Sequence, residues 1–310
     1  MPTRRGSIRL FRIAGLNVYL HWSWFVVALF AVAARRGIYA SPAFNVLEYL
    51  ALFLIVLLHE CGHALACRSV GGRADEIVLW PLGGVAYVQP PLRPGPTLWS
   101  IVAGPLVNVV IAGVLFAYGS FIGLPLGELP AQPSDSALFI QAVWYLNFGL
   151  LVFNLLPVYP LDGGQILQSL LWFILGRARS LMAASLLGFL GVAYFFYVAW
   201  VRGNAWLGIV ALFILATCWQ GFLNARHLVR AGRGPRRPGA MCPGCQTAPP
   251  VGQWWTCSAC GRPFDVFAGE AVCPNCGTRF TGARCLNCGE THPMSEWHVS
   301  NPPLRDARSD

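Results

Sequence analysis

Long apolar stretches separated by short polar segments dominate the first three quarters of the chain. A helix needs roughly 20 mainly apolar residues to cross the hydrocarbon core of a bilayer. Runs close to this length occupy about residues 18–34, 46–66, 98–122, 137–156, 181–201 and 205–223. The pattern therefore predicts an all-α polytopic membrane fold with about six spans.

Two apolar segments leave the number of spans open. Residues 165–175 are too few to cross, so we expect a re-entrant or interfacial helix or a continuation of the span before it. A seventh full span there would invert the orientation of everything that follows. The first run could also be a cleaved signal peptide, because basic residues precede it and "AVAA" follows it. Its length and His21 favour a retained span.

Composition and charge agree with a membrane protein. The 310 residues are 55% hydrophobic and only 11% charged, whereas soluble domains carry about 25% charged residues. All basic residues are arginines, and they cluster before the first run and after the second, fourth and sixth runs. By the positive-inside rule both termini are cytoplasmic, in the cell (inner) membrane. The same rule accounts for much of the net charge of +9 without a nucleic-acid partner.

Composition also divides the chain along its length. Residues 1–228 form the apolar membrane domain. Residues 229–240, "VRAGRGPRRPGA", are basic and rich in Gly and Pro, which suits a flexible linker. Residues 241–290 are rich in cysteine, and residues 291–310 are expected to be disordered.

The second run contains the stretch "HECGH", with His59, Glu60 and His63 among apolar neighbours. An ionisable side chain at the bilayer centre costs about 2.5–3.5 kcal/mol on insertion scales, so three need a partner or a ligand. Two histidines four residues apart share one helix face and can bind one metal ion. Glu60 can then act on water at that ion, as in the H-E-x-x-H pattern of zinc enzymes. A pair of buried structural histidines is the plainer alternative.

A catalytic zinc usually has three protein ligands, and Asp162 is a candidate for the third. It follows Pro157 and Pro160, which interrupt the fourth run. Broken backbone at membrane depth is tolerated only where protein buries it or a cavity lies beside it. At about 1.5 Å per residue, Asp162 reaches a depth similar to that of His59 and His63. The three can meet, although depth alone does not show that they do.

"HECGH" together with "FNLLPVYPLDGG" resembles the site-2 protease family of intramembrane zinc metalloproteases in its compact six-span form. The family pairs H-E-x-x-H on one span with Asn-x-x-Pro-x-x-Pro-x-Asp-Gly on another. Those positions are Asn154, Pro157, Pro160, Asp162 and Gly163. The stretches "PLGGVAYV" and "GPLVN" are also similar. The resemblance covers about residues 18–225 and leaves out the cysteine-rich tail.

The resemblance implies an endopeptidase that cleaves within or beside membrane spans. It implies one zinc held by His59, His63 and Asp162, with Glu60 as the general base. Asn154 would position substrate or stabilise the oxyanion, or it would only cap backbone freed by the prolines. For Asn108, helix packing around a nearby glycine is the favoured interpretation. A non-proteolytic metal carrier or scaffold remains the alternative, but it needs no base beside its ligands.

Residues 76–89 combine β-branched, aromatic and glycine residues. They predict a small re-entrant hairpin or an edge strand on the active-site side. Such a strand could hold a substrate extended by strand addition. The candidate substrate contacts are Gly83, Gly84, Val85 and Tyr87.

Four C-x-x-C pairs mark the tail, and they suggest structural zinc sites. Eleven residues separate the first pair from the second, and eight separate the third from the fourth. This spacing predicts tandem four-cysteine zinc ribbons with two structural zinc ions. Disulfides are disfavoured on a cytoplasmic tail. The eight candidate ligands are Cys242, Cys245, Cys257, Cys260, Cys273, Cys276, Cys285 and Cys288.

The partners follow from these assignments. We expect a single-span membrane protein as substrate and a cytoplasmic partner for the ribbons. Nucleic acid is disfavoured, because acidic residues such as Asp265 and Glu290 dilute any basic patch. A third hypothesis is that the protein is a membrane-tethered binding module whose main functional part is the zinc ribbons. A homo-oligomer is left open.

Overall fold

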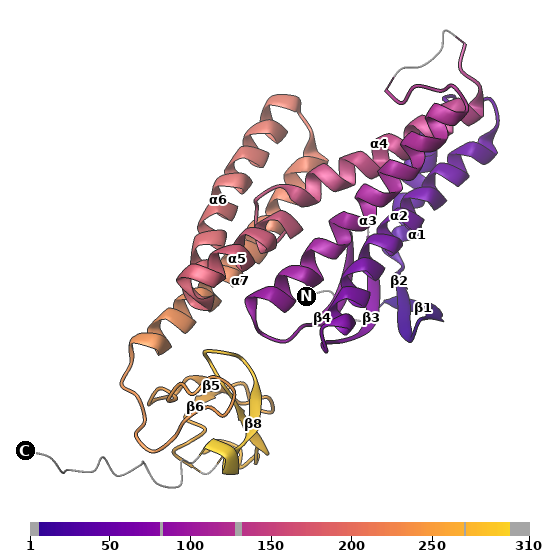
Figure 1. Ribbon diagram of the computed structural model, residues 1–310. Coiled ribbons are helices and arrows are strands. Elements are labelled where there is room, and N and C mark those ends of the chain that lie inside the picture. Colours follow the sequence, from indigo (N-terminus) through magenta and orange to yellow (C-terminus); the bar gives the residue numbers. More distant parts are fainter. Residues whose placement is uncertain (1–5, 81–82, 128–131, 270, 298–310) are drawn as a thin grey trace, which may run out of the picture. The chain divides into compact units, whose positions relative to one another are not determined.

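The computed structural model describes residues 6–80, 83–127, 132–269 and 271–297. The chain forms two compact units (Figure 1). Unit 1 comprises Met1–Ile174 and Ala183–Trp219, and unit 2 comprises Leu175–Met182 and Gln220–Asp310. Unit 1 therefore holds most of the apolar helices, and unit 2 holds the cysteine-rich tail with the end of the last helix.

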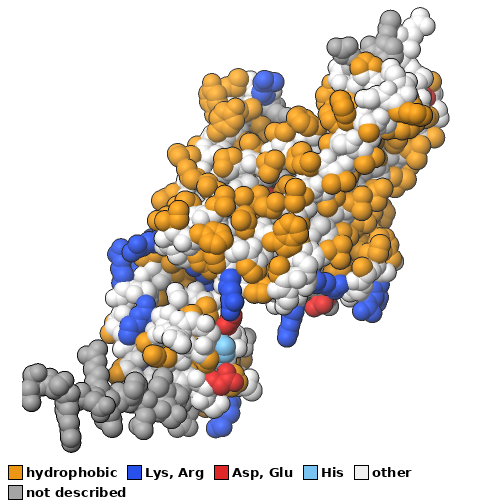
Figure 2. Space-filling view, in the orientation of Figure 1, with side chains coloured by type: hydrophobic (Ala, Val, Ile, Leu, Met, Phe, Trp, Pro, Cys, Tyr) orange, Lys and Arg blue, Asp and Glu red, His pale blue; other side chains and the backbone are white. Residues whose placement is uncertain are grey.

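Five helices are long and apolar enough to cross a membrane. They are α2 (Pro42–Ser69), α3 (Pro94–Phe121), α4 (Asp135–Leu155), α6 (Arg177–Arg202) and α7 (Ala205–Arg233). Large apolar side chains cover their surfaces (Figure 2), with Phe121 88% and Trp200 87% exposed. Such exposure is favourable only against lipid or another apolar surface. These helices confirm a multi-pass membrane protein, with five of the predicted spans in place.

The first predicted span, residues 18–34, is not one long helix. Leu16–His21 form strand β2, and the helix that follows, α1 (Ser23–Ala34), has only 12 residues. At 1.5 Å per residue α1 is about 18 Å long, short of a hydrocarbon core of about 30 Å. The strand forms because Leu16, Val18 and Leu20 alternate toward the core of a sheet. Residues 165–175 belong to a separate 14-residue helix, α5 (Asp162–Leu175).

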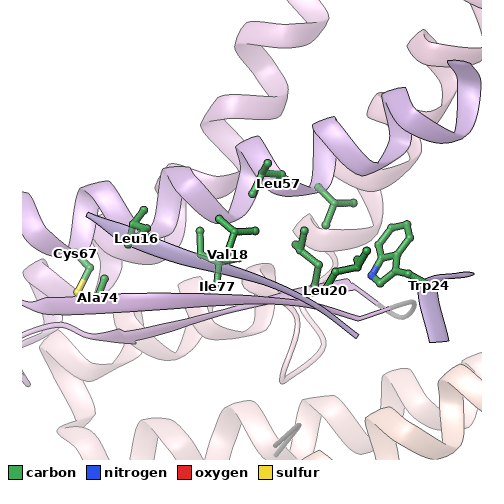
Figure 3. Packing of buried hydrophobic residues seen from close by; sticks show 11 residues of the cluster. Leu16, Val18, Leu20, Trp24, Leu57, Cys67, Ala74 and Ile77 are labelled. Carbon is green, nitrogen blue, oxygen red and sulfur yellow. The ribbon is translucent and has the colours of Figure 1, made fainter. Parts of the chain in front are cut away.

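A four-stranded sheet packs against the second half of α2. Its strands are β1 (Ser7–Ile13), β2, β3 (Arg73–Trp80) and β4 (Gly83–Gln89), in that order. The β2–β3 pair is parallel and the other two pairs are antiparallel. Val18 and Ile77 face Leu57 of α2 across the core (Figure 3). The expected hairpin at 76–89 is present as β3–β4, and the N-terminal strands that extend it were not predicted.

Unit 2 contains two small hairpins around a compact aromatic core. Strand β5 (Trp255–Thr256) pairs with β6 (Pro263–Phe264), and β7 (Gly282–Arg284) pairs with β8 (Thr291–Pro293). A short 3-10 helix, η1 (Met294–Trp297), follows β8. Trp297 is fully buried, and its carbonyl accepts the N–H of Met241. The expected disorder from residue 291 onward therefore does not hold for 291–297, and residues 298–310 lie outside the described part.

The predicted linker, residues 229–240, is also structured. Helix α7 continues to Arg233, past the expected boundary at 228. The Arg237 guanidinium then pairs with Asp265 at 2.7 Å, and its backbone N–H donates to the Pro249 carbonyl at 2.9 Å. The backbone between helix and ribbons is thus attached to the cysteine-rich module. Glycine and proline here shape a turn and do not make a free tether.

Candidate metal centre and active site

Helix α2 brings the first two candidate ligands together. It runs unbroken through the "HECGH" stretch, so His59 and His63 lie on one face. Their rings are 4.7 Å apart and their Nε2 atoms are 3.1 Å apart. Both side chains are buried, as is Glu60 between them.

The third candidate ligand enters from the break between α4 and α5. Helix α4 ends at Leu155, a tight turn follows, and α5 begins at Asp162. A Cβ on Gly163 would lie 2.2 Å from the Leu155 carbonyl oxygen, so this turn requires glycine. Asp162 Oδ2 lies 3.1 Å from His59 Nε2 and 3.4 Å from His63 Nε2. The structure thus places all three predicted ligands around one point.

The geometry of the three atoms fits a zinc ion. Tetrahedral zinc with bonds of about 2.0–2.1 Å to N and O places neighbouring ligand atoms roughly 3.3 Å apart, close to the separations found here. Asp162 Oδ2 is buried without a hydrogen-bond partner among the described residues, as expected of a metal ligand. A Cβ on Gly104 of α3 would lie 2.3 Å from His63 Nε2. Space for the ion therefore depends on that glycine.

Helix α3 orients both imidazole rings from behind. His63 Nδ1 donates to the Ser100 carbonyl at 2.9 Å. His59 Nδ1 donates to the side-chain oxygen of Asn108. Because each Nδ1 carries the proton, each Nε2 presents its lone pair to the metal point.

Strand β4 holds the candidate base. The backbone N–H of Ala86 donates to Glu60 Oε2 at 2.8 Å. A Cβ on Gly84 would lie 2.2 Å from Glu60 Cγ, so the strand can approach only with glycine there. Glu60 is therefore fixed beside the metal ligands on one side and the hairpin on the other.

The other candidate residues lie at different distances from this point. Asn154 Nδ2 is 3.4 Å from His59 Nε2, so its amide reaches the metal point. Gly83 and Val85 pair through the backbone with Trp80 and Val78 of β3. The Val85 side chain lies outside the described atoms. Tyr87 is half-buried on the same strand.

The eight tail cysteines form two clusters, and the pairing differs from the tandem prediction. The first and fourth C-x-x-C pairs form one cluster, and the second and third form the other. Sulfur separations across the clusters are 3.6–3.8 Å, and tetrahedral zinc with Zn–S bonds of about 2.3 Å requires roughly 3.8 Å. The outer cluster is Cys242, Cys245, Cys285 and Cys288; the inner cluster is Cys257, Cys260, Cys273 and Cys276. The two sites are nested because β7–β8 returns to the start of the module.

Sequence reasoning missed two supporting groups. The sequence favours a packing role for Asn108, yet its side-chain oxygen contacts a metal ligand. Asn147, in the middle of α4, was not singled out, although it is fully buried and bonded to Asn108. An asparagine flanked by apolar residues within a span was the available signal, because burying an unpartnered amide is costly.

The fold is a bundle of apolar helices, and its site combines a buried His-His-Asp ligand set with an adjacent glutamate. This combination is typical of a membrane-embedded metallopeptidase. The sequence matches Peptidase family M50 over residues 48–138 and 129–198. The chain belongs to this family, the site-2 proteases.

Individual relatives cover the same region. The chain is 32% identical over 182 residues to a zinc metalloprotease of Methanocaldococcus jannaschii, which is 59% of this chain and 50% of that protein. It is 28% identical over 157 residues to stage IV sporulation protein FB of Bacillus subtilis, covering 49% of this chain and 46% of that protein. The chain thus spans about half the length of these curated relatives.

A solved structure shows the same fold. The site-2 protease from M. jannaschii superposes with a TM-score of 0.51 at 28% identity, over 70% of this chain and 95% of that one.

Proposed function

We propose that this protein is an intramembrane zinc metalloendopeptidase that hydrolyses peptide bonds within or beside transmembrane segments. The observation that carries the proposal is the convergence of His59, His63 and Asp162 on one point with Glu60 beside it. A metal carrier or scaffold would need the three ligands only. Nothing in the site or its relatives favours that alternative.

The chain's own groups supply the steps of hydrolysis. A zinc ion held by the three ligands supplies Lewis-acid chemistry that makes water a nucleophile near neutral pH. Glu60 accepts the proton of the attacking water on its carboxylate and passes it to the leaving amide nitrogen. The Ala86 N–H keeps this carboxylate oriented. Asn154 Nδ2 is placed to donate to the carbonyl oxygen as negative charge develops there.

Strand β4 suits the presentation of an extended substrate. It is the last strand in the sheet order, and no described strand pairs with its outer edge. A helical span hides its amides in its own hydrogen bonds, so cleavage requires a local extended conformation. Pairing of that segment with β4, near Gly84 and Tyr87, would hold the scissile bond next to Glu60. We propose a single-span membrane protein as the substrate.

Charge placement supports an orientation for these steps. Arg68 donates to the carbonyls of Ala14 and Ala74, which places this basic group at the sheet end of α2. Arg230 and Arg233 end α7 before the cysteine-rich module. With basic ends in the cytoplasm, we propose that the sheet and both termini face the cytoplasm of the cell membrane, with α1 and the segment that joins it to α2 completing a sixth crossing. Products then leave on the cytoplasmic side.

The nested zinc module is proposed to bind a cytoplasmic partner or the cytoplasmic part of the substrate. Small modules of this kind are typically unfolded without metal, so its two zinc ions are structural. Among the described residues of the module, the exposed large hydrophobic side chains are Met241 and Val251, and these are the candidates for such contacts. Self-association of the chain through Met241 and Val251 is the second proposed use.

The test uses the full chain in proteoliposomes with a single-span substrate labelled at its cytoplasmic end. Wild type should release a shortened cytoplasmic fragment, and Glu60→Gln should bind substrate without cleaving it. Both should carry three zinc ions per chain. Equal turnover by wild type and Glu60→Gln would overturn the proposal, as would a wild type that binds zinc but leaves every single-span substrate intact.

A further inference from the structure

Two asparagines meet in the apolar interface between α3 and α4. Asn108 and Asn147 are both fully buried. Asn108 Nδ2 donates to Asn147 Oδ1 at 2.8 Å, and Asn147 Nδ2 donates to the Asn108 backbone carbonyl at 2.9 Å. Asn147 lies outside the H-E-x-x-H, Asn-x-x-Pro-x-x-Pro-x-Asp-Gly and "GPLVN" stretches.

The backbone carbonyl of Asn108 sets the direction of these hydrogen bonds. A backbone carbonyl can only accept, so the Asn147 side chain must turn its NH₂ toward the Asn108 backbone. Its oxygen then faces Asn108 and can only accept as well. Asn108 must therefore turn its own NH₂ to Asn147, which leaves its side-chain oxygen for His59.

The last hydrogen bond in this series, between Asn108 and His59, connects it to the metal site. Because Asn108 presents an oxygen, the proton of a neutral His59 ring lies on Nδ1 and the lone pair on Nε2. A flipped Asn108 amide would present NH₂ to Nδ1 and favour the proton on Nε2. That tautomer cannot bind a metal from Nε2. The orientation of the Asn147 amide on α4 thus decides whether His59 Nε2 on α2 can bind the metal.

The two histidines differ in this respect. His63 Nδ1 donates to the Ser100 backbone carbonyl, which cannot flip and so needs no second residue to orient it. His59 relies on a side-chain amide, whose two ends have almost the same shape. Only His59 therefore needs a further group that distinguishes oxygen from nitrogen.

We propose that Asn147 is a positioning residue that fixes the tautomer of His59 through Asn108. The proposal rests on the metal site of the proposed function. Helix α4 then serves both halves of the site, since Asn147 lies in its middle and the turn that carries Asp162 follows its end.

The test compares Asn147→Leu and Asn147→Asp, with zinc affinity of the membrane site as the readout. Leucine removes both hydrogen bonds but is apolar and of similar size. A buried aspartic acid stays protonated in such surroundings, so it can donate to the backbone carbonyl and accept from Asn108. We expect Asn147→Leu to weaken zinc binding by about 10–100-fold, as for other groups behind metal ligands. Asn147→Asp should stay close to wild type.

A purely structural role predicts the opposite order. Leucine would suit a lipid-embedded helix interface better than an acid, so Asn147→Leu would then be harmless and Asn147→Asp damaging. That ranking, or equal zinc affinity in wild type and Asn147→Leu, would overturn the proposal. Asn108→Leu should match Asn147→Leu, and the double variant should be no worse than either, because the groups act in series.

Controls separate this result from misfolding and from failure of the proposed activity. The two tail zinc ions are an internal standard, so after chelator dialysis wild type should retain three zinc ions and Asn147→Leu two. Gln141→Leu removes another buried amide from α4 and should retain three. Zinc binding is measured without substrate, so a wild type that binds zinc but cleaves nothing would refute the protease proposal and leave this one intact.

Discussion

Ala86 of β4 and Glu60 of α2 are joined by a hydrogen bond of 2.8 Å from the strand's backbone N–H to the carboxylate. The strand proposed to receive the substrate is thus the element that orients the base. An extended segment added along β4 would be placed next to that carboxylate without any change in α2. Strand β4 therefore determines both the position of the substrate and the orientation of the base.

Ala86→Pro tests this shared support. Proline has no N–H, and the N–H it removes is the one donated to Glu60. Loss of a hydrogen bond to a charged group costs about 1.5–3 kcal/mol, so hydrolysis should fall by roughly 10–100-fold. Zinc content should stay at three ions per chain. Ala86→Gly keeps the N–H and should lose much less; similar rates for the two variants would show that the bond does not matter.

Gly104→Ala should empty the membrane metal site. Its new Cβ would lie 2.3 Å from His63 Nε2, where the ion must fit. We expect loss of one zinc ion and of hydrolysis. Gly113→Ala on the same helix meets nothing within 4 Å and should be neutral or stabilising by up to about 1 kcal/mol. The zinc content of both purified variants tests this prediction. Three zinc ions in Gly104→Ala would contradict the proposed position of the membrane metal site.

Paired cysteine variants distinguish nested from tandem zinc sites. Cys242→Ser with Cys288→Ser alters only the outer cluster and should remove one tail zinc. Cys242→Ser with Cys257→Ser alters both clusters and should remove two. Tandem pairing predicts the reverse, with two lost in the first variant and one in the second. Zinc counts on the purified full chain give the answer directly.

Trp297 should be essential to the folded tail. Its side chain is fully buried against the aromatic core of unit 2, and large-to-small changes at such positions cost about 3–5 kcal/mol. A chain ending at Glu290 should therefore lose the protease resistance of the module, whereas a chain ending after Trp297 should keep it. Equal resistance would mean that β8 and η1, which the shorter chain lacks, add nothing to this core.

Much of the membrane domain followed from the sequence because its signals are local. Apolar length alone located α2, α3, α4, α6 and α7. The spacing of His59 and His63 on one helix face required no tertiary information, and the prolines before Asp162 marked a break in a span. These features depend on residues a few positions apart, where helix geometry is fixed.

What the sequence missed depends on contacts between distant segments. Leu16, Val18 and Leu20 alternate with more polar residues over only six positions, too few to separate strand β2 from the apolar run that follows it. Pairing with β3 and packing against α2 decide the assignment. The cysteine spacing fits nested and tandem pairing equally well, and the return of β7–β8 decides between them. The role of Asn147 follows only from its hydrogen bond to Asn108 on another helix.

Nesting has a consequence for the order in which the tail acquires metal. The inner site closes a loop of about 12 residues and the outer site one of about 39, so closing the outer loop first costs roughly 1 kcal/mol more chain entropy. Once the inner site has formed, it shortens the free chain that the outer site must enclose. Scarce zinc should therefore fill the inner site before the outer one, and the junction with α7 should be the last part of the tail to become rigid.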